Sequence, residues 1–170
     1  MNHGTFGPLA SQHLAAVMFD LLAETRMENV YYRGTGPSVV GILSNEVQVM
    51  FGSMSAMLPL IQDGKLRALA TASACRSQLL PQLPMVGDFV PGFGAELTYS
   101  LCTPVGASAA LKRGLEAAAK QAVENPGLIG ELQTRGFEPD YETGDSFASS
   151  IDADMVRWVD VTRRAGISLS

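Results

Sequence analysis

Short apolar runs and amphipathic segments alternate along the first seventy residues, with glycine-rich breaks between them. Between residues 11 and 24, apolar side chains recur at the three- and four-residue spacing that marks one face of a helix. These side chains are Leu14, Val17, Met18, Leu21 and Leu22. Strands that alternate with short helices indicate an α/β fold with a parallel sheet. The pattern predicts strands at 27–32, 47–51 and 66–72, and helices at 11–24, 37–43 and 55–62.

The pattern changes after residue 72. Prolines and glycines interrupt residues 73–94, which are therefore expected to cross the surface as an extended segment. Asn125 is a predicted N-cap, and Gly136 and Gly166 are predicted to end helices in the left-handed region. The remaining predicted elements are strands at 95–103 and 137–141, and helices at 108–124, 126–134 and 145–164.

The first three predicted strand-to-helix turns share one chemistry, because each combines glycine, a small hydroxyl and the start of a helix. In a parallel sheet, such turns lie at the carboxyl edge, where ligands usually bind. Free N–H groups and the helix dipole favour an anion there. The same residues are also ordinary helix caps, and composition alone does not separate the two interpretations. The turns are Thr5/Gly7/Ser11, Gly34/Thr35/Ser38 and Gly52/Ser53/Ser55.

Composition narrows the classes of partner and cofactor. The chain has 12 basic and 17 acidic residues, a formal net charge of -5, and no basic cluster. This balance argues against nucleic acid or an anionic membrane as the main partner. Gly4-Thr5-Phe6-Gly7 lacks the third glycine and the downstream acid of a dinucleotide fingerprint, and no Walker lysine follows the loops. No cofactor and no metal site are therefore expected.

Few residues could support catalysis. His3 and His13 are the only histidines, and a helix cap or a packed ring is the expected role of His13. A small hydrolase that uses His13 with Ser11 is a further hypothesis, although no carboxylate is placed to orient the histidine. Cys75 and Cys102 match no zinc or redox spacing. We expect two unpaired, mostly buried thiols, and one disulfide is the alternative.

The chain also carries a series of short strings in a fixed order: His13-Leu14-Ala15, Val30-Tyr31-Tyr32-Arg33-Gly34 with Pro37, Val49-Met50-Phe51, residues 64–70, Arg76 with Leu83-Pro84, Pro91-Gly92-Phe93, Trp158 and Ala165-Gly166-Ile167. In this order they resemble the Bug/TctC solute-binding receptors of tripartite tricarboxylate transporters. The resemblance implies a periplasmic-binding-protein type II fold, whose two lobes are parallel sheets flanked by helices. Residues 1–94 would be the second, ligand-binding lobe. Residues 95–170 would be the return strand and helices of an incomplete first lobe.

The resemblance also implies a function. The ligand would be a small organic acid, such as a di- or tricarboxylate, an amino acid or an aromatic carboxylate. The membrane subunits of a transporter would be the partners. The location would be the periplasm, or the cytoplasm for this version of the chain, because residues 1–7 carry no signal segment.

Seven residues form the predicted ligand site: Thr5, Gly7 and Ser11 around one carboxylate, Thr35, Ser38 and Ser53 as the rest of the wall, and Tyr32 packed against the ligand. Leu9 stands where the family has glycine, and Ala10 stands where a hydroxyl is expected. A leucine restricts the backbone there. The alternative to a receptor is a truncated remnant that binds no ligand and self-associates through an exposed lobe interface.

Overall fold

The computed structural model describes residues 1–167 and has an α/β fold. Strands β1 (Asn2–Thr5) and β2 (Glu28–Tyr31) pair in parallel, with Thr5 opposite Tyr31. Helix α1 (Ser11–Ala23) joins the two strands, and α2 (Thr35–Leu43) follows β2. The predicted alternation of parallel strands and short helices is therefore confirmed.

The sheet is smaller than the sequence predicted. Val49 pairs with His3, and Thr71 pairs with Met85, each as an isolated parallel bridge. The predicted continuous strands at 47–51, 66–72, 95–103 and 137–141 are therefore wrong for the described part of the chain. A strand requires a neighbour with which it exchanges backbone hydrogen bonds. Within the described residues, the backbone of residues 96–103 makes no such bond to another segment.

The helices lie close to their predicted positions. Asn125 caps its helix as predicted, because its side chain accepts the N–H groups of Gly127 and Leu128 at 2.9 and 3.2 Å. Gly136 and Gly166 follow helices with φ of 79° and 69°, also as predicted. The remaining helices are α3 (Met54–Gln62), the short 3-10 helix η1 (Val86–Asp88), α4 (Ala109–Val123), α5 (Pro126–Thr134) and α6 (Gly144–Arg164).

The apolar core lies between α1 and the C-terminal half of α6. Its buried members are Met18, Val90, Phe93 and Val161, and Trp158 packs against them. Because Val161 belongs to α6, residues on both sides of the proposed boundary at residue 94 share one core. The assignment of residues 1–94 and 95–170 to two lobes stays a prediction.

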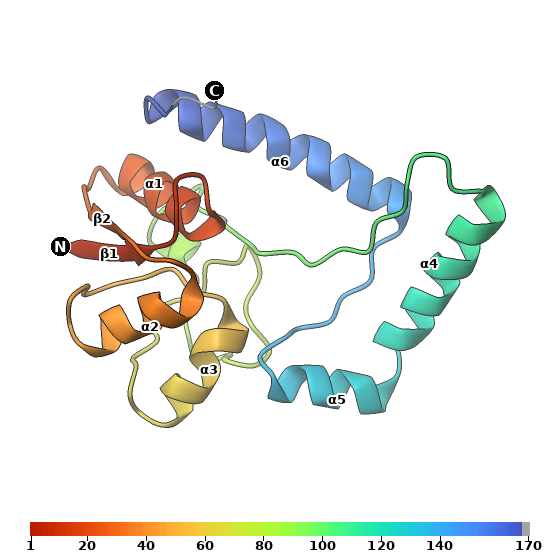
Figure 1. The fold of residues 1–170 in the computed structure, drawn as a ribbon, viewed down its shortest axis with the longest axis horizontal. Helices are drawn as coiled ribbons and strands as arrows, with labels where there is room; N and C mark the ends of the chain where they lie inside the picture. The colour runs from red at the N-terminus through yellow and green to blue at the C-terminus, as the bar shows by residue number, and fades with distance from the viewer. Residues whose placement is uncertain (168–170) are drawn as a thin grey trace.

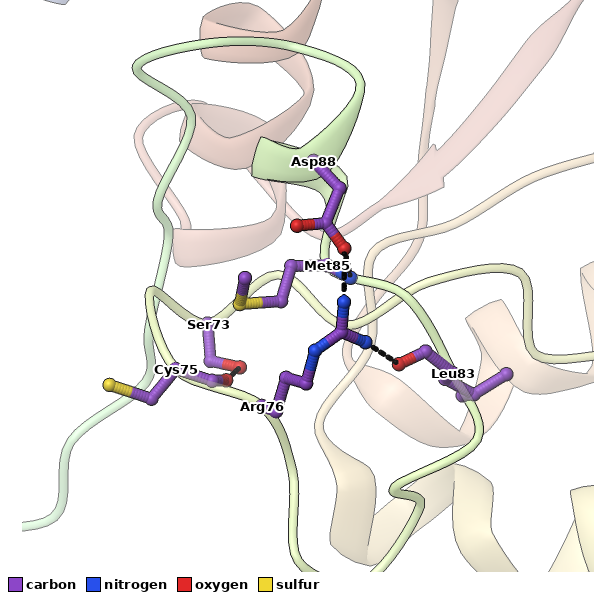
Figure 2. Close-up of polar contacts among 6 residues, drawn as sticks. All are labelled: Ser73, Cys75, Arg76, Leu83, Met85 and Asp88. Carbon is purple, nitrogen blue, oxygen red and sulfur yellow. Dashed lines mark hydrogen bonds and ion pairs between the residues drawn. The ribbon is translucent and has the colours of Figure 1, made fainter.

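The surface segment of residues 73–94 is fixed by side-chain hydrogen bonds. The Arg76 guanidinium donates to the Asp88 carboxylate at 3.0 Å and to the Leu83 carbonyl oxygen at 3.4 Å (Figure 2). The same carboxylate accepts the Met85 N–H at 3.0 Å. These contacts order the segment where it has little regular secondary structure.

Both cysteines are exposed and free, so the prediction of buried thiols is wrong. Cys75 lies in the surface segment, where its carbonyl oxygen accepts a hydrogen bond from the Ser73 hydroxyl (Figure 2). Cys102 lies in the stretch that makes no backbone hydrogen bonds to another described segment. Neither position packs the thiol against the core, which lies between α1 and α6.

Helices α4 and α5 stand apart from the sheet: one extended connector leads from the sheet region to α4, and a second joins α5 to α6 (Figure 1). Neither helix contains a buried residue. No helix in residues 1–167 is both long and apolar enough to cross a membrane. Many apolar side chains in the connector before α4, in α4 and in α6 are exposed: Leu97, Tyr99, Leu101, Val105, Leu111, Ile151, Met155 and Val156.

Candidate carboxylate-binding site

The first three helices begin without a side-chain cap. The side chains of their N-caps, Ala10, Gly34 and Ser53, accept no hydrogen bond from the first turn. The last three helices differ, because their N-caps Ser108, Asn125 and Thr143 all accept such bonds. The N–H groups in the first turn of a helix have no partner within the helix. The uncapped turns of α1, α2 and α3 therefore retain donors for an anion.

These uncapped turns lie on one side of the sheet. Helix α1 follows β1 and α2 follows β2, and the two strands run parallel. All three helices begin on the side that faces the connectors in the middle of the molecule (Figure 1). The positive ends of three helix dipoles therefore act on the same edge of the sheet.

Thr5 ends β1 at this edge. The residue is fully buried, and its hydroxyl has no hydrogen-bond partner among the described residues. A buried hydroxyl without a partner costs about 1–3 kcal/mol. Such an atom is a candidate for bonding to a ligand, and Thr5 was predicted at this position.

The loop of residues 6–10, called the site loop below, joins β1 to α1. Gly7 and Leu9 both adopt the left-handed region, with φ of 81° and 64°. Glycine adopts this conformation freely, whereas another residue pays about 1–2 kcal/mol. The finding agrees with the expectation that the position of Leu9 favours glycine.

The other predicted hydroxyls differ in their surroundings. Ser38 is fully buried, and its hydroxyl donates to the Thr35 carbonyl oxygen at 2.8 Å. The Ser11 hydroxyl is exposed and donates to the Gln12 side chain at 3.2 Å. Ser53 is half-buried and accepts a bond from the Ser55 hydroxyl at 3.4 Å. Ser11 and Ser53 can reorient toward a ligand more readily than Ser38.

Tyr32 packs against the backbone of its own lobe. A Cβ atom at Gly41 would lie 2.2 Å from the Tyr32 hydroxyl, and one at Gly4 would lie 3.5 Å from the ring. The hydroxyl is buried without a hydrogen-bond partner among the described residues. Burial, together with the nearby Glu46 carboxylate, raises the pKa of Tyr32. The packing against Gly4 and Gly41 explains the position of the Tyr32 ring without a ligand. Contact between Tyr32 and a ligand therefore stays a prediction.

The His3 side chain links β1 to Asn29 of β2 and to Phe51 by hydrogen bonds. It is fully buried, with Nδ1 at 3.0 Å from the Asn29 side-chain oxygen and Nε2 accepting the Phe51 N–H at 3.3 Å. This pair of contacts assigns the proton to Nδ1. Burial lowers the pKa of His3, so the ring is neutral at pH 7.

We expect acid to destabilise the protein through this histidine. The folded-state pKa of His3 lies below its unfolded value of about 6.5. The unfolded chain therefore binds more protons, and the stability present above about pH 6.5 falls as the pH drops, by up to about 1.4 kcal/mol per pH unit for each such group. Urea unfolding across this range measures the slope, which His3→Gln should reduce. A stability that is independent of pH would contradict the assignment.

The His13 ring is buried and packed, which is one of the two roles predicted for it, with its centroid 5.8 Å from that of Tyr31. Its Nδ1 accepts the Leu9 N–H at 3.2 Å, and its Nε2 lies 3.4 Å from the Tyr31 hydroxyl. It makes no bond to Ser11, whose hydroxyl is bonded to Gln12, so the pair required by the hydrolase hypothesis is not formed. Sequence reasoning missed the bond between Leu9 and His13, although their four-residue spacing was a usable signal.

Metal binding is also unsupported in this region. Within residues 1–167, no three or more His, Cys, Asp or Glu side chains are grouped so that they could hold a metal ion. The site consists of hydroxyls, backbone N–H groups and helix ends. This is the chemistry that holds an anion without a cation.

The described lobe is a parallel α/β unit whose first three helices lack side-chain caps. The model of the TctC family, the tripartite tricarboxylate transporter family receptor, matches residues 1–167. The chain belongs to this family, which confirms the resemblance seen in its sequence. It is 29% identical over 163 residues to protein BugT of Bordetella pertussis, covering 95% of this chain and 50% of that protein. The chain thus spans about half the length of this curated relative.

Solved structures show the same fold. Rpa4515 of R. palustris, solved with adipate, superposes with a TM-score of 0.88 at 22% identity, covering 99% of this chain and 56% of that chain. MatC (Rpa3494) of Rhodopseudomonas palustris, solved with bound malate, has a TM-score of 0.75 at 21% identity, covering 95% and 56%. Both likenesses establish the fold, and the chain again corresponds to little more than half of each structure.

Proposed function

We propose that this chain provides the carboxylate-binding lobe of a periplasmic solute receptor. The observation that carries the proposal is the contrast between the two sets of helices. Only α1, α2 and α3 lack side-chain caps among the six α-helices of residues 1–167, and these three follow the strand segments of one lobe. The unpaired hydroxyl of Thr5 lies at the same edge.

The energies are sufficient for a small anion. Each helix end stabilises a negative charge by about 0.3–1 kcal/mol when exposed, and by up to about 2 kcal/mol when partly buried. A hydrogen bond from a hydroxyl to a charged group adds about 1.5–3 kcal/mol. Three helix ends and Thr5 together can therefore hold a carboxylate without a lysine or arginine.

Dicarboxylates are the favoured ligand class. The solved relatives were obtained with adipate and with malate, which both carry two carboxylates. Family membership supports the membrane subunits of a tripartite transporter as partners and the periplasm as the location. The family model describes a receptor, which supports a binding role over an enzymatic one.

Thr5→Val tests the site directly. Titration calorimetry with adipate and malate should show binding to the unchanged chain. The valine variant should bind about tenfold to 150-fold more weakly, since one hydrogen bond to a charged group is lost. Its stability without ligand should stay equal or rise, because a buried unpaired hydroxyl is removed.

Thr71→Val is the matched control. Thr71 is also buried with an unpaired hydroxyl, but it pairs with Met85 and is followed by the surface segment, not by a helix. The change should leave affinity unaltered. Equal losses in both variants, or unaltered affinity in Thr5→Val, would reject the site.

A second candidate function is self-association without ligand binding. The exposed side chains of Leu97, Tyr99 and Leu101 alternate along a stretch with no backbone partner in the described structure. Exposed apolar surface of this kind often marks an interface. Light scattering should then report a dimer or larger species that Leu101→Ser disrupts. A monomer at high concentration would rule this candidate out.

A further inference from the structure

The site loop is strained where it approaches the first turn of α1. Leu9 holds a left-handed conformation that costs a non-glycine residue about 1–2 kcal/mol. The N-cap of α1, Ala10, supplies no side-chain bond that could fix the turn. Another group must therefore hold the backbone of Leu9 in place.

His13 supplies that group. The residue is 6% exposed, and its Nδ1 accepts the Leu9 N–H at 3.2 Å. Since an N–H donates to Nδ1, the ring proton resides on Nε2, which faces the Tyr31 hydroxyl at 3.4 Å. The His13 and Tyr31 rings lie 5.8 Å apart. The imidazole thus connects the site loop to the end of β2.

We propose that His13 is a positioning residue, whose neutral imidazole holds the site loop in its left-handed conformation and so presets Gly7 and the first turn of α1 for a carboxylate. The proposal rests on the proposed function, because the loop is part of a site only if a ligand binds there. A loop that is already ordered spares the ligand the cost of ordering it.

Protonation would remove this contact. A doubly protonated imidazole carries N–H groups on both nitrogens and cannot accept a bond from Leu9. The titratable or charged groups near the ring are the Tyr31 hydroxyl from β2, His3 from β1, Asp20 from α1 itself, and Arg26 after α1. Ala165 and Ile167, from the end of the chain, bring no charge. Burial lowers the pKa of His13, so the loop is held at neutral pH and released in acid.

Two variants separate positioning from packing. His13→Phe keeps a ring but removes the acceptor, whereas His13→Asn keeps an acceptor oxygen that does not titrate near neutral pH. Adipate binding should weaken by about threefold to tenfold in His13→Phe, which corresponds to one neutral hydrogen bond. His13→Asn should retain most of the affinity and lose the decrease in affinity expected for the unchanged chain as the pH falls below about 6.5, since burial lowers the pKa of His13. Equal losses in both variants, or wild-type binding by His13→Phe, would overturn the proposal.

Hydrogen exchange of the Leu9 amide tests the contact without a ligand. The amide should be protected in the unchanged chain and in His13→Asn, and exchange about threefold to tenfold faster in His13→Phe. If adipate does not bind but this protection pattern holds, the proposed function fails for adipate while the positioning of the loop stands. Rapid exchange in the unchanged chain would overturn the positioning role itself.

Discussion

Replacing Phe93 by alanine is expected to lower the free energy of unfolding by about 3–5 kcal/mol. Phe93 is only 6% exposed, and its ring lies 5.7 Å from that of Phe51 and 6.2 Å from that of Phe19. Truncation would leave a cavity in the core that α1 shares with α6. Urea unfolding, monitored by the fluorescence of Trp158, measures this loss of stability. Trp158 is the single tryptophan and packs against the same cluster.

Phe89→Ala is the matched control, because Phe89 belongs to the same surface segment but is 73% exposed. A surface substitution of this kind changes stability by less than about 0.5 kcal/mol. Similar losses in the two variants would mean that the core is not placed as described.

Gly136→Ala is expected to cost about 2–4 kcal/mol, from left-handed strain and overpacking together. The residue ends α5 with φ of 79°. A Cβ atom there would lie 2.9 Å from the backbone of Met54 and Ser55 at the start of α3. The backbone cannot yield as a flexible side chain does, so the contact between the α5 turn and α3 would open. Chemical denaturation measures the loss.

Gly166→Ala isolates the strain from the contact. Gly166 ends α6 with φ of 69°, but a Cβ atom there would meet nothing within 4 Å. Its cost should be limited to about 1–2 kcal/mol. If both alanine variants lose the same free energy of unfolding, the close contact between Gly136 and α3 does not contribute to stability.

Local patterns were enough to predict the helices. Apolar spacing, the Asn125 cap and the two terminal glycines are all readable within one or two turns of the chain, and α5 lies at its predicted residues. Strands depend on partners that are distant in the sequence. Residues 96–103 have the apolar content of a strand, but their backbone bonds to no other segment in the described structure, which no local pattern could reveal.

The site, like the strands, depends on contacts between residues that are distant in the sequence, so it could be predicted only in part. The small hydroxyls and glycines lie in the turns where they were predicted, and their part in binding stays a prediction. Their composition did not show that Ser38 bonds to its own helix or that Tyr32 packs onto Gly41. The decisive features are the unpaired hydroxyl of Thr5 and the missing caps of three helices. Both depend on burial and on the direction of side chains, which arise only when the elements pack.

An NMR titration of the backbone amides with adipate tests the central claim most directly. If the uncapped helix ends bind a carboxylate, the largest shifts will fall in the first turns of α1, α2 and α3 and in the site loop. The capped first turns of α4 and α5 provide the comparison within the same spectrum, and their amides should not move. Shifts concentrated in α4 to α6, or no shifts with adipate or malate, would contradict the claim.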